Sequence, residues 1–333
     1  MKTLEFCLNN LIEQKTVQNI FVRIGKNNEI LYDTYRGKVN ETTLFDMASV
    51  TKIMATTSLA LIALDKGWLS LENTVKDFYP DCQKDITIFN LLTHTIGIGH
   101  KSLNKAGNTY DNIAEKILEI PLDISIGENV LYSCPGFILL GKILEKVFGQ
   151  RLDNAFDNLI SKSLELQNTS FLPKYKENCV NANLKEEKRG VVNDYNCQYL
   201  GGVAGNAGLF SNVADITKYV QCLLNKGMPL FREKIFDKAV QNYTADKDKS
   251  RGLGFLYVDK RYEQTGGLFQ DGAIGHCGHT GQSIFVDYRT GLYVIILSDA
   301  TISTIKKYGQ EHYDEVMNMR KELHSAIRQD LKL

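Results

Sequence analysis

Near its N-terminus the chain reads Ile20-Phe21-Val22-Arg23-Ile24-Gly25, then Lys26-Asn27-Asn28, then Glu29-Ile30-Leu31-Tyr32-Asp33-Thr34-Tyr35. β-Branched and aromatic residues dominate the two outer runs, whereas the middle stretch is short and polar. This pattern predicts a β-hairpin.

The C-terminal third contains three more stretches with the composition of strands. They are residues 252–258, 282–287 and 291–298, and Tyr288-Arg289-Thr290 forms a turn between the last two. We expect those two to pair antiparallel. An amphipathic helix over residues 311–331 then closes the chain.

Between these two strand-rich ends the sequence is mainly helical. We predict helices over residues 50–66, 86–94, 111–119, 137–148, 152–164 and 213–225, several of them followed by glycine. The polar stretch 174–196 is expected to be a surface loop. The chain therefore reads as strands, a long helical middle, strands and a final helix.

This order predicts an α+β fold. Short connections favour pairing of the N-terminal hairpin with the C-terminal strands, in an antiparallel β-sheet flanked by helices. We expect that sheet domain to comprise residues 1–64 and 235–333, with an inserted all-helical domain over residues 65–234.

Composition narrows the possible functions. The 333 residues include 39 Lys and Arg and 39 Asp and Glu, so the formal net charge is zero. Proteins that bind nucleic acid or anionic membranes through bulk charge usually carry a basic excess, so neither partner is expected. The partner that remains is a small molecule or a short peptide, and the composition leaves the oligomeric state open.

The N-terminus and the cysteines indicate the compartment. Glu5 interrupts any apolar signal core, and the longest apolar-rich stretch, residues 53–64, is too short to span a bilayer. Seven cysteines without a C-x-x-C pair favour reduced thiols. We therefore expect a cytoplasmic protein.

Ser49-Val50-Thr51-Lys52 stands where the helix over residues 50–66 begins. Residues three apart share one face of a helix, and the unpaired N–H groups of the first turn suit a developing oxyanion. Burial on an apolar helix would disfavour the ammonium form of Lys52, so its amine could act as a base. By itself this short motif also fits a helix cap beside a solvated lysine.

Further motifs follow in order. Tyr132-Ser133-Cys134 opens the helix over 137–148, and His279-Thr280-Gly281 precedes the strand over 282–287. Two more stretches are Leu91-Leu92-Thr93-His94-Thr95-Ile96-Gly97-Ile98 and the glycine-rich run over 202–211. Together they resemble the serine β-lactamase and penicillin-binding-protein superfamily. The resemblance is to the branch with class C β-lactamases, D,D-carboxypeptidases and related esterases, and it extends over residues 18–330.

The resemblance implies a role for each matching residue. Ser49 would be the nucleophile, and Lys52 and Tyr132 would form the base system, with Tyr132 relaying the proton to the leaving group. His279 would replace the lysine usual in the third motif, followed by Thr280 and Gly281. The backbone N–H groups of Ser49 and Gln282 would form the oxyanion hole. No cofactor or metal is implied.

One position departs from the family pattern. Cys134 stands where the family carries an asparagine that binds a substrate amide, and a thiol is a poor substitute. This departure favours ester turnover over amide or β-lactam recognition. Asn206, where relatives often carry histidine, is treated as neutral.

Some of these residues also allow other interpretations. His276 and His279 could suggest a metal site, but residues three apart on a strand point to opposite faces. The glycine-rich run has no P-loop lysine, and His94 is expected to be a hydrogen-bonded structural residue.

The sequence therefore predicts a serine hydrolase that acts through an acyl-enzyme on an ester, a D-amino-acid peptide or a peptidoglycan-derived amide. The alternatives are a catalytically weak penicillin-binding-like interaction or sensor domain and an unrelated two-domain binding protein.

Overall fold

The computed structural model describes residues 1–183, 188–300 and 310–333. Its main feature is a six-stranded antiparallel sheet in the order β2-β1-β9-β8-β7-β6. The strands are β1 Ile20–Lys26, β2 Glu29–Arg36, β6 Leu256–Tyr257, β7 Ile274–Cys277, β8 Ser283–Val286 and β9 Leu292–Ser298. The hairpin from one end of the chain thus pairs with strands from the other, and the expected α+β sheet is confirmed.

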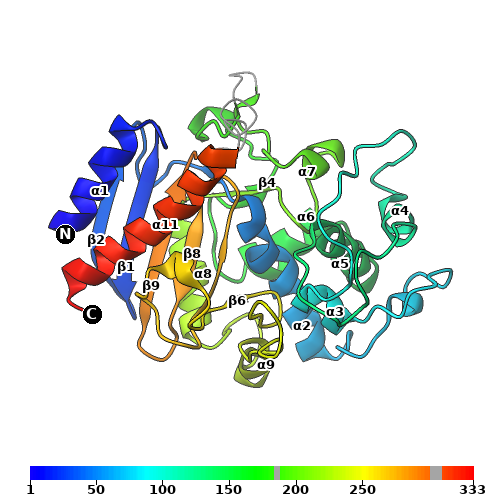
Figure 1. Ribbon diagram of the computed structural model, residues 1–333. Coiled ribbons are helices and arrows are strands. Elements are labelled where there is room, and N and C mark those ends of the chain that lie inside the picture. Colours follow the sequence, from blue (N-terminus) through cyan, green and yellow to red (C-terminus); the bar gives the residue numbers. More distant parts are fainter. Residues whose placement is uncertain (184–187, 301–309) are drawn as a thin grey trace.

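The central strands of the sheet are buried on both faces, and the side chains of alternate residues point to opposite faces. In β1, Val22 and Ile24 pack in the cluster that includes helices α1 Lys2–Glu13 and α11 Gln310–Leu331, whereas Phe21 packs in the main core. Figure 1 shows α1 and α11 side by side across one face of the sheet. The sheet is therefore the middle layer of the fold.

The remaining helices lie mostly in the middle of the chain. They are α2 Ser58–Lys66, α3 Ile88–Thr93, α4 Ile113–Leu118, α5 Cys134–Phe148, α6 Leu152–Phe156, α7 Tyr195–Tyr199, α8 Val213–Leu224 and α9 Glu233–Ala239. Short helical turns are η1 Ala48–Val50, η2 Lys52–Thr57, η3 Val75–Asp77, η4 Asp157–Ser161, η5 Lys176–Asn178 and η7 Glu263–Thr265. Helix α8 packs against β8 and β9, although its sequence lies within the segment predicted to form the helical domain.

The middle of the chain also contains strands that were not expected. A second sheet joins β3 Phe45–Asp46, β5 Leu209–Ser211 and β4 Ser170–Phe171 in that order. The segment 65–234 is therefore not all helical, because its short apolar runs pair with a strand from the N-terminal part. This pairing brings the glycine-rich run beside the segment that carries Ser49.

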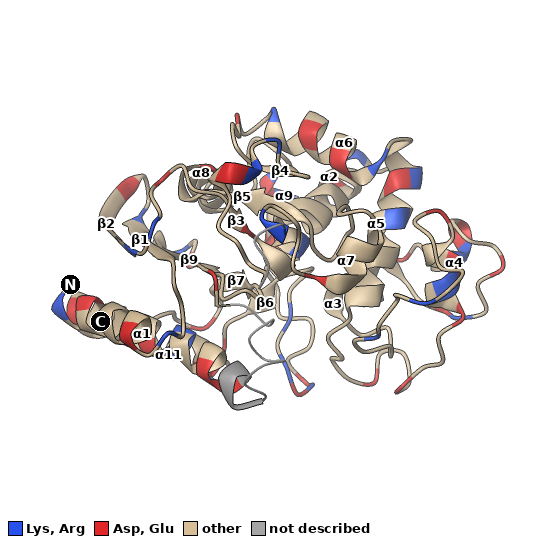
Figure 2. Cartoon of the chain, turned by 90° about the horizontal axis from the view of Figure 1, so that it is seen from above, with Lys and Arg blue, Asp and Glu red and all other residues tan. Residues whose placement is uncertain are grey.

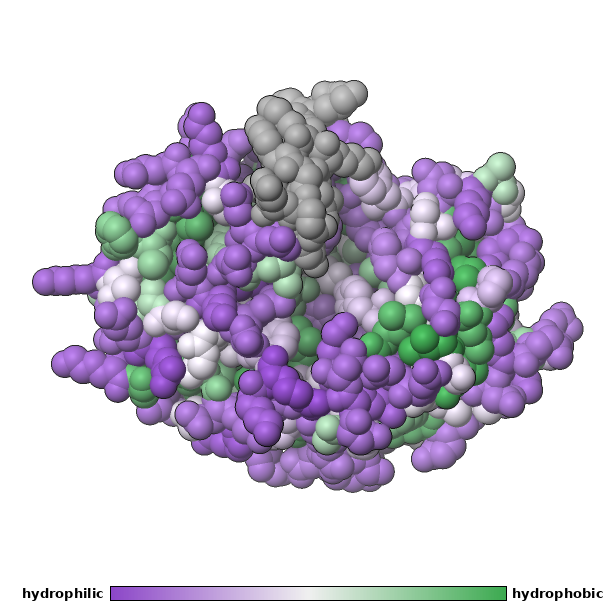
Figure 3. Space-filling model, viewed as in Figure 1, coloured by the Kyte–Doolittle hydropathy of each residue, from purple (hydrophilic) through white to green (hydrophobic). Residues whose placement is uncertain are grey.

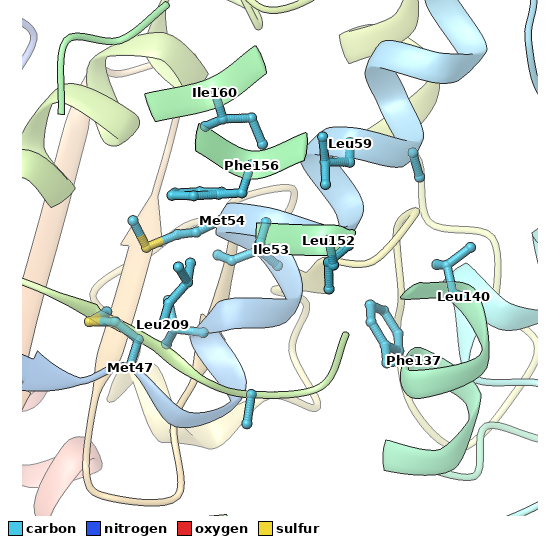
Figure 4. Packing of buried hydrophobic residues seen from close by; sticks show 14 of the residues in the cluster. Met47, Ile53, Met54, Leu59, Phe137, Leu140, Leu152, Phe156, Ile160 and Leu209 are labelled. Carbon is cyan, nitrogen blue, oxygen red and sulfur yellow. The ribbon is translucent and has the colours of Figure 1, made fainter. Parts of the chain in front are cut away.

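The predicted helix over residues 50–66 has three parts. It begins with the 3-10 turn η1, continues as the π-helical η2 and ends as α2, where Gly67 adopts a left-handed φ of 72°. The stretch Ala48–Lys66 is long and apolar enough to cross a membrane, but 83% of its most apolar window is buried inside the protein. Figure 4 shows Ile53 and Met54 packed in this core.

The expected strand over residues 252–258 is reduced to β6. Gly254 has a φ of 78°, and the N–H of Gly252 donates to the carbonyl of Phe255, so a turn takes up the first part of the stretch.

Figure 2 shows acidic and basic residues interspersed along the helices. Figure 3 shows a largely hydrophilic face with a hydrophobic area on its right.

Candidate active site

Ser49 lies in η1, directly after a strained turn. Ala48 has a φ of 45°, in the left-handed region that residues with a Cβ rarely adopt. The carboxylate of Asp46 accepts the N–H of Ala48 at 2.8 Å and that of Asn193 at 2.6 Å. Burial raises the pKa of Asp46 to about 6, although both N–H groups favour its ionised form. These buried contacts hold the turn that presents Ser49 to a cavity.

The side chains of Lys52 and Tyr132 meet at Ser49. Lys52 Nζ lies 3.0 Å from Ser49 Oγ, and Tyr132 Oη donates to the same oxygen at 2.7 Å. The residues come from η1, from the start of η2 and from the segment just before α5. The structure therefore brings together the three residues that the sequence predicts as nucleophile and base system.

Lys52 is fully buried and has several neighbours besides Ser49. Its Nζ donates to the carbonyl of Asn206 at 2.9 Å, lies 3.6 Å from the Cys134 Sγ, and lies 4.9 Å from the centre of the Tyr132 ring. The hydrogen bond from Lys52 to the Asn206 carbonyl therefore ties the glycine-rich run over residues 202–211 to the active-site lysine.

The protonation of Lys52 differs from the expectation. Burial alone lowers the pKa of Lys52, but the nearby Cys134 and Tyr132 outweigh it, so the pKa lies above its usual value. Burial likewise opposes ionisation of Cys134, but Lys52 and a hydrogen bond with His100 lower the pKa of the thiol. In the absence of substrate the ammonium form of Lys52 is therefore favoured. The sequence predicts the opposite from burial alone, because the motif over residues 49–52 does not show that the Cys134 thiol lies beside Lys52.

Tyr132 is held by His94 and by the start of α5. The backbone N–H of Ser133 donates to His94 Nδ1 at 3.1 Å, and the His94 ring lies 4.7 Å from the Tyr132 ring. Ser133 caps α5 by accepting the N–H of Gly136 at 2.9 Å. His94 has the hydrogen-bonded structural position that the sequence predicts, and it orients Tyr132.

The third motif lies in a different register from the one expected. His276, on β7, lines the cavity with Ser49, and its ring centre lies 6.2 Å from that of Tyr132. Gly278 follows at the end of the strand, where an added Cβ would lie 2.9 Å from the carbonyl oxygen of Met47. His279 lies beyond the strand, at the exposed rim of the same cavity.

Thr280, Gly281 and Gln282 do not line this cavity. The Thr280 hydroxyl and the Gln282 side-chain amide both donate to the carbonyl of Asp46, at 3.1 and 2.6 Å. Arg320 also donates to the carbonyls of Gly278 and Gln282. These contacts hold the turn between β7 and β8 against the Ser49 segment. The structure therefore does not bring Thr280, Gly281 and Gln282 to the cavity beside Ser49, because all three lie on the buried side of the turn.

The cavity has a volume of about 540 Å³ and opens beside Ser49. Its walls come from β7, from the segment 248–264 and from α11. Within the described ranges no group of three or more His, Cys, Asp or Glu side chains could hold a metal ion. The arrangement suits nucleophilic attack by a serine hydroxyl that two proton-carrying groups assist.

Two residues of the cavity were not predicted as active-site residues: His276, considered only as a metal ligand, and Arg251. His276-Cys277-Gly278 and His279-Thr280-Gly281 are consecutive H-x-G triplets, and the first of them could have been recognised as a second candidate. Arg251, which lies over the Tyr132 ring at 5.7 Å, directly precedes the predicted strand over residues 252–258. No motif in the sequence marks it.

Comparisons with known proteins identify the family of this chain and several of its relatives. A family model described as Beta-lactamase matches residues 7–310. The N-acetylmuramyl-L-alanine amidase of Bacillus subtilis strain 168 is 28% identical over 304 residues, covering 79% of this chain and 69% of the relative. A protein of Escherichia coli strain K12 named "Putative D-alanyl-D-alanine carboxypeptidase" is 29% identical over 315 residues, covering 80% and 71%.

Solved structures share the fold. EstCE1, a hydrolase with promiscuous acyltransferase activity, superposes with a TM-score of 0.75 at 18% identity, over 97% of this chain and 98% of that one. The octameric penicillin-binding protein homologue from Pyrococcus abyssi gives 0.74 at 20% identity, over 99% and 80%.

The fold and the matching family model together define the class of this protein, a serine hydrolase. The chain belongs to the Beta-lactamase family.

Proposed function

We propose that the enzyme works through an acyl-enzyme on Ser49, formed from a small ester, a D-amino-acid peptide or a peptidoglycan-derived amide. The observation that carries this proposal is the contact of one hydroxyl oxygen with both Lys52 Nζ and Tyr132 Oη, at 3.0 and 2.7 Å. A serine becomes a useful nucleophile when an adjacent base takes its proton. The amidase and the carboxypeptidase named above suggest the substrate classes.

Acylation begins once Lys52 has lost its extra proton. Ser49 Oγ attacks the carbonyl carbon, and the hydroxyl proton passes to the Lys52 amine. Tyr132 gives its proton to the leaving alcohol or amine as the bond to the carbonyl carbon breaks, and Lys52 returns a proton to Tyr132. Water then attacks the Ser49 ester with the assistance of Lys52 and Tyr132, which releases the carboxylic acid and restores the Ser49 hydroxyl.

The turn after β7 supplies the second half of the oxyanion hole in this proposal. Gly278 lies against the Met47 carbonyl, so the backbone that follows it, at His279, comes next to the Ser49 segment. The N–H groups of Ser49 and His279 would then stabilise the oxyanion, and His276 takes the position that the sequence assigned to His279. Removing one such donor typically costs about 2.7–4 kcal/mol of barrier stabilisation.

Cys134 favours esters over amides in this proposal. Its thiol lies beside Lys52, where an amide side chain could have bound the substrate's own amide. An ester needs less assistance, because its leaving group is a weaker base than an amine. We therefore expect the enzyme to be faster on activated esters than on penicillins.

Intact-mass spectrometry tests the proposal directly. We expect a fluorophosphonate and p-nitrophenyl acetate each to add one group, and peptide mapping to place it on Ser49. The variant Ser49→Ala should remain unlabelled, and labelling that persists there would refute the nucleophile assignment. An acyl group that forms but is never hydrolysed would favour a penicillin-binding-like sensor instead.

We also propose that the enzyme works in the cytoplasm or another reducing compartment. All seven cysteines are free thiols, and five of them are buried. Such a set is typical of a reducing environment. Fractionation of cells that express the natural gene would test this, and recovery of the protein outside the cytoplasm would contradict it.

A further inference from the structure

Three arginines line the cavity beside Ser49, and two of them are committed to the protein. Arg261 pairs with Asp259 at 2.6 Å. Arg320 donates to the carbonyls of Gly278 and Gln282. Their positive charges are therefore used to hold the cavity wall.

Arg251 is the third, and it differs from the other two. The residue is only 5% exposed, yet its Nε and Nη1 have no hydrogen-bond partner among the residues that the structure describes. No described carboxylate lies within salt-bridge distance of it. Leaving such donors unpaired in a buried site is costly, and charged donors cost more than neutral ones.

The unpaired guanidinium of Arg251 borders the space in which a substrate would bind. Arg251 contacts the face of the Tyr132 ring, with 5.7 Å from its central carbon to the ring centre, and both residues line the cavity with Ser49. Nearby, His276 Nδ1 contacts the carbonyl of Cys277 at 2.8 Å, so this nitrogen carries the proton. His276 Nε2 is buried and also has no partner within the described ranges. Two orphaned polar groups therefore border the same space.

We propose that Arg251 is the anchor for a carboxylate of the substrate, an inference that rests on the acyl-enzyme function proposed above. Arginine donors bind carboxylates through charge-assisted hydrogen bonds, which are stronger than neutral ones. Besides the three arginines, the cavity is lined by the cation Lys249 and by the carboxylates of Asp248, Asp259 and Glu263. The four cations exceed the three carboxylates by one, so a single negative charge fits the electrostatics of the cavity better than a phosphate dianion. The apolar part of the wall, with Leu256 and Val316, accommodates the rest of the molecule.

Binding tests the anchor without catalysis. We expect the wild-type protein to bind N-benzoylglycine at least about tenfold more tightly than its neutral amide, N-benzoylglycinamide, in an NMR titration. Arg251→Gln should remove this preference, and Arg251→Lys should retain part of it. Arg261→Gln is the matched control, because that cation is already paired, and it should keep the preference.

Equal affinity of the wild-type protein for the two compounds would overturn the proposal even if Arg251→Gln does not fold. So would a preference that Arg261→Gln removes as completely as Arg251→Gln, because the bulk charge of the cavity would then be responsible.

Matched esters separate this proposal from the underlying function. One pair carries a carboxylate or an amide on the leaving group, as the acetyl esters of 3-hydroxybenzoate and 3-hydroxybenzamide. The other carries the same difference on the acyl group, as monophenyl glutarate and phenyl glutaramate. We expect kcat/KM to favour the anion at least about tenfold in one pair, which identifies the side of the scissile bond that faces Arg251.

The outcomes are distinct. Turnover of all four esters without preference for an anion would refute the carboxylate anchor and leave the acyl-enzyme intact. Failure to acylate Ser49 with any ester, together with Arg251-dependent binding of N-benzoylglycine, would refute the function and leave the anchor.

Discussion

The contact between Cys134 and Lys52 predicts an unusual pH dependence. Lys52 lowers the pKa of Cys134, and the thiolate that results favours the ammonium form of Lys52, whereas acylation requires the amine. Cys134→Ser keeps a small polar group but removes the ionisable one. The pKa of Lys52 should then fall, because burial alone opposes its charge. The acid limb of the acylation rate should therefore move to lower pH.

The distance between the two groups sets the size of the effect. Unit charges 3.6 Å apart attract by about 1 kcal/mol in a water-like dielectric and by about 5 kcal/mol at an effective dielectric constant of 20. The lower figure corresponds to a rate increase of about sevenfold wherever the acid limb controls the rate. Lys52 is fully buried, so the gain should exceed this minimum.

The assay is the burst of p-nitrophenol from p-nitrophenyl acetate between pH 5 and pH 9. The control is Cys222→Ser, which removes a buried thiol that contacts the carbonyl of Gly227 rather than Lys52. Cys134→Asn should show the same shift and should in addition react faster with a penicillin than Cys134→Ser does. An acid limb that coincides in wild type and Cys134→Ser would refute the role given to the thiol.

Three further outcomes are expected. Lys52→Met should lower the rate of Ser49 acylation by about 10²–10⁴-fold while the protein still unfolds cooperatively, and near-normal ester hydrolysis would contradict its role as base. Gly278→Ala should slow acylation at least about tenfold by pushing the turn away from the Met47 carbonyl, 2.9 Å from the added Cβ; an unchanged burst rate would show that the turn does not contribute. His276 should stay neutral throughout pH 6.5–8, because burial and the nearby Lys52 lower its pKa; an NMR titration midpoint in that range would contradict this.

The sheet could be predicted because its signal is local. Residues 20–35 carry the alternation and the polar turn of a hairpin, and the strands β8 and β9 are apolar runs separated by a turn. Strands β1, β8 and β9 are buried on both faces and are therefore largely apolar, whereas the edge strand β2 is mostly exposed. Helix α1 was not predicted, because its three buried leucines gain their importance only from packing against α11.

The site was predictable only in part, for a related reason. Ser49 and Lys52 are three residues apart, so local geometry places them together. The motif that includes Tyr132 resembles the second motif of the family closely enough to be recognised. The third motif depended on where β7 ends. Cys277 pairs with Ser283 across the turn, which puts His276 on the cavity wall and His279 beyond the strand. Two consecutive H-x-G triplets do not reveal that register, whereas strand pairing determines it.

The residues that carry out the reaction and the residues that select the substrate also come from different parts of the fold. Lys52 and Tyr132 reach Ser49 from segments that the core holds, since Lys52 begins η2 and Tyr132 precedes α5. The groups left to contact a substrate, above all Arg251, come instead from turns and strand ends around the cavity. A hydroxyl flanked by an amine and a phenol can attack many acyl groups, so its geometry identifies a reaction and leaves the substrate open. The unpaired guanidinium restricts that choice, because a neutral ester would leave its donors unpaired whereas a carboxylate would bind them.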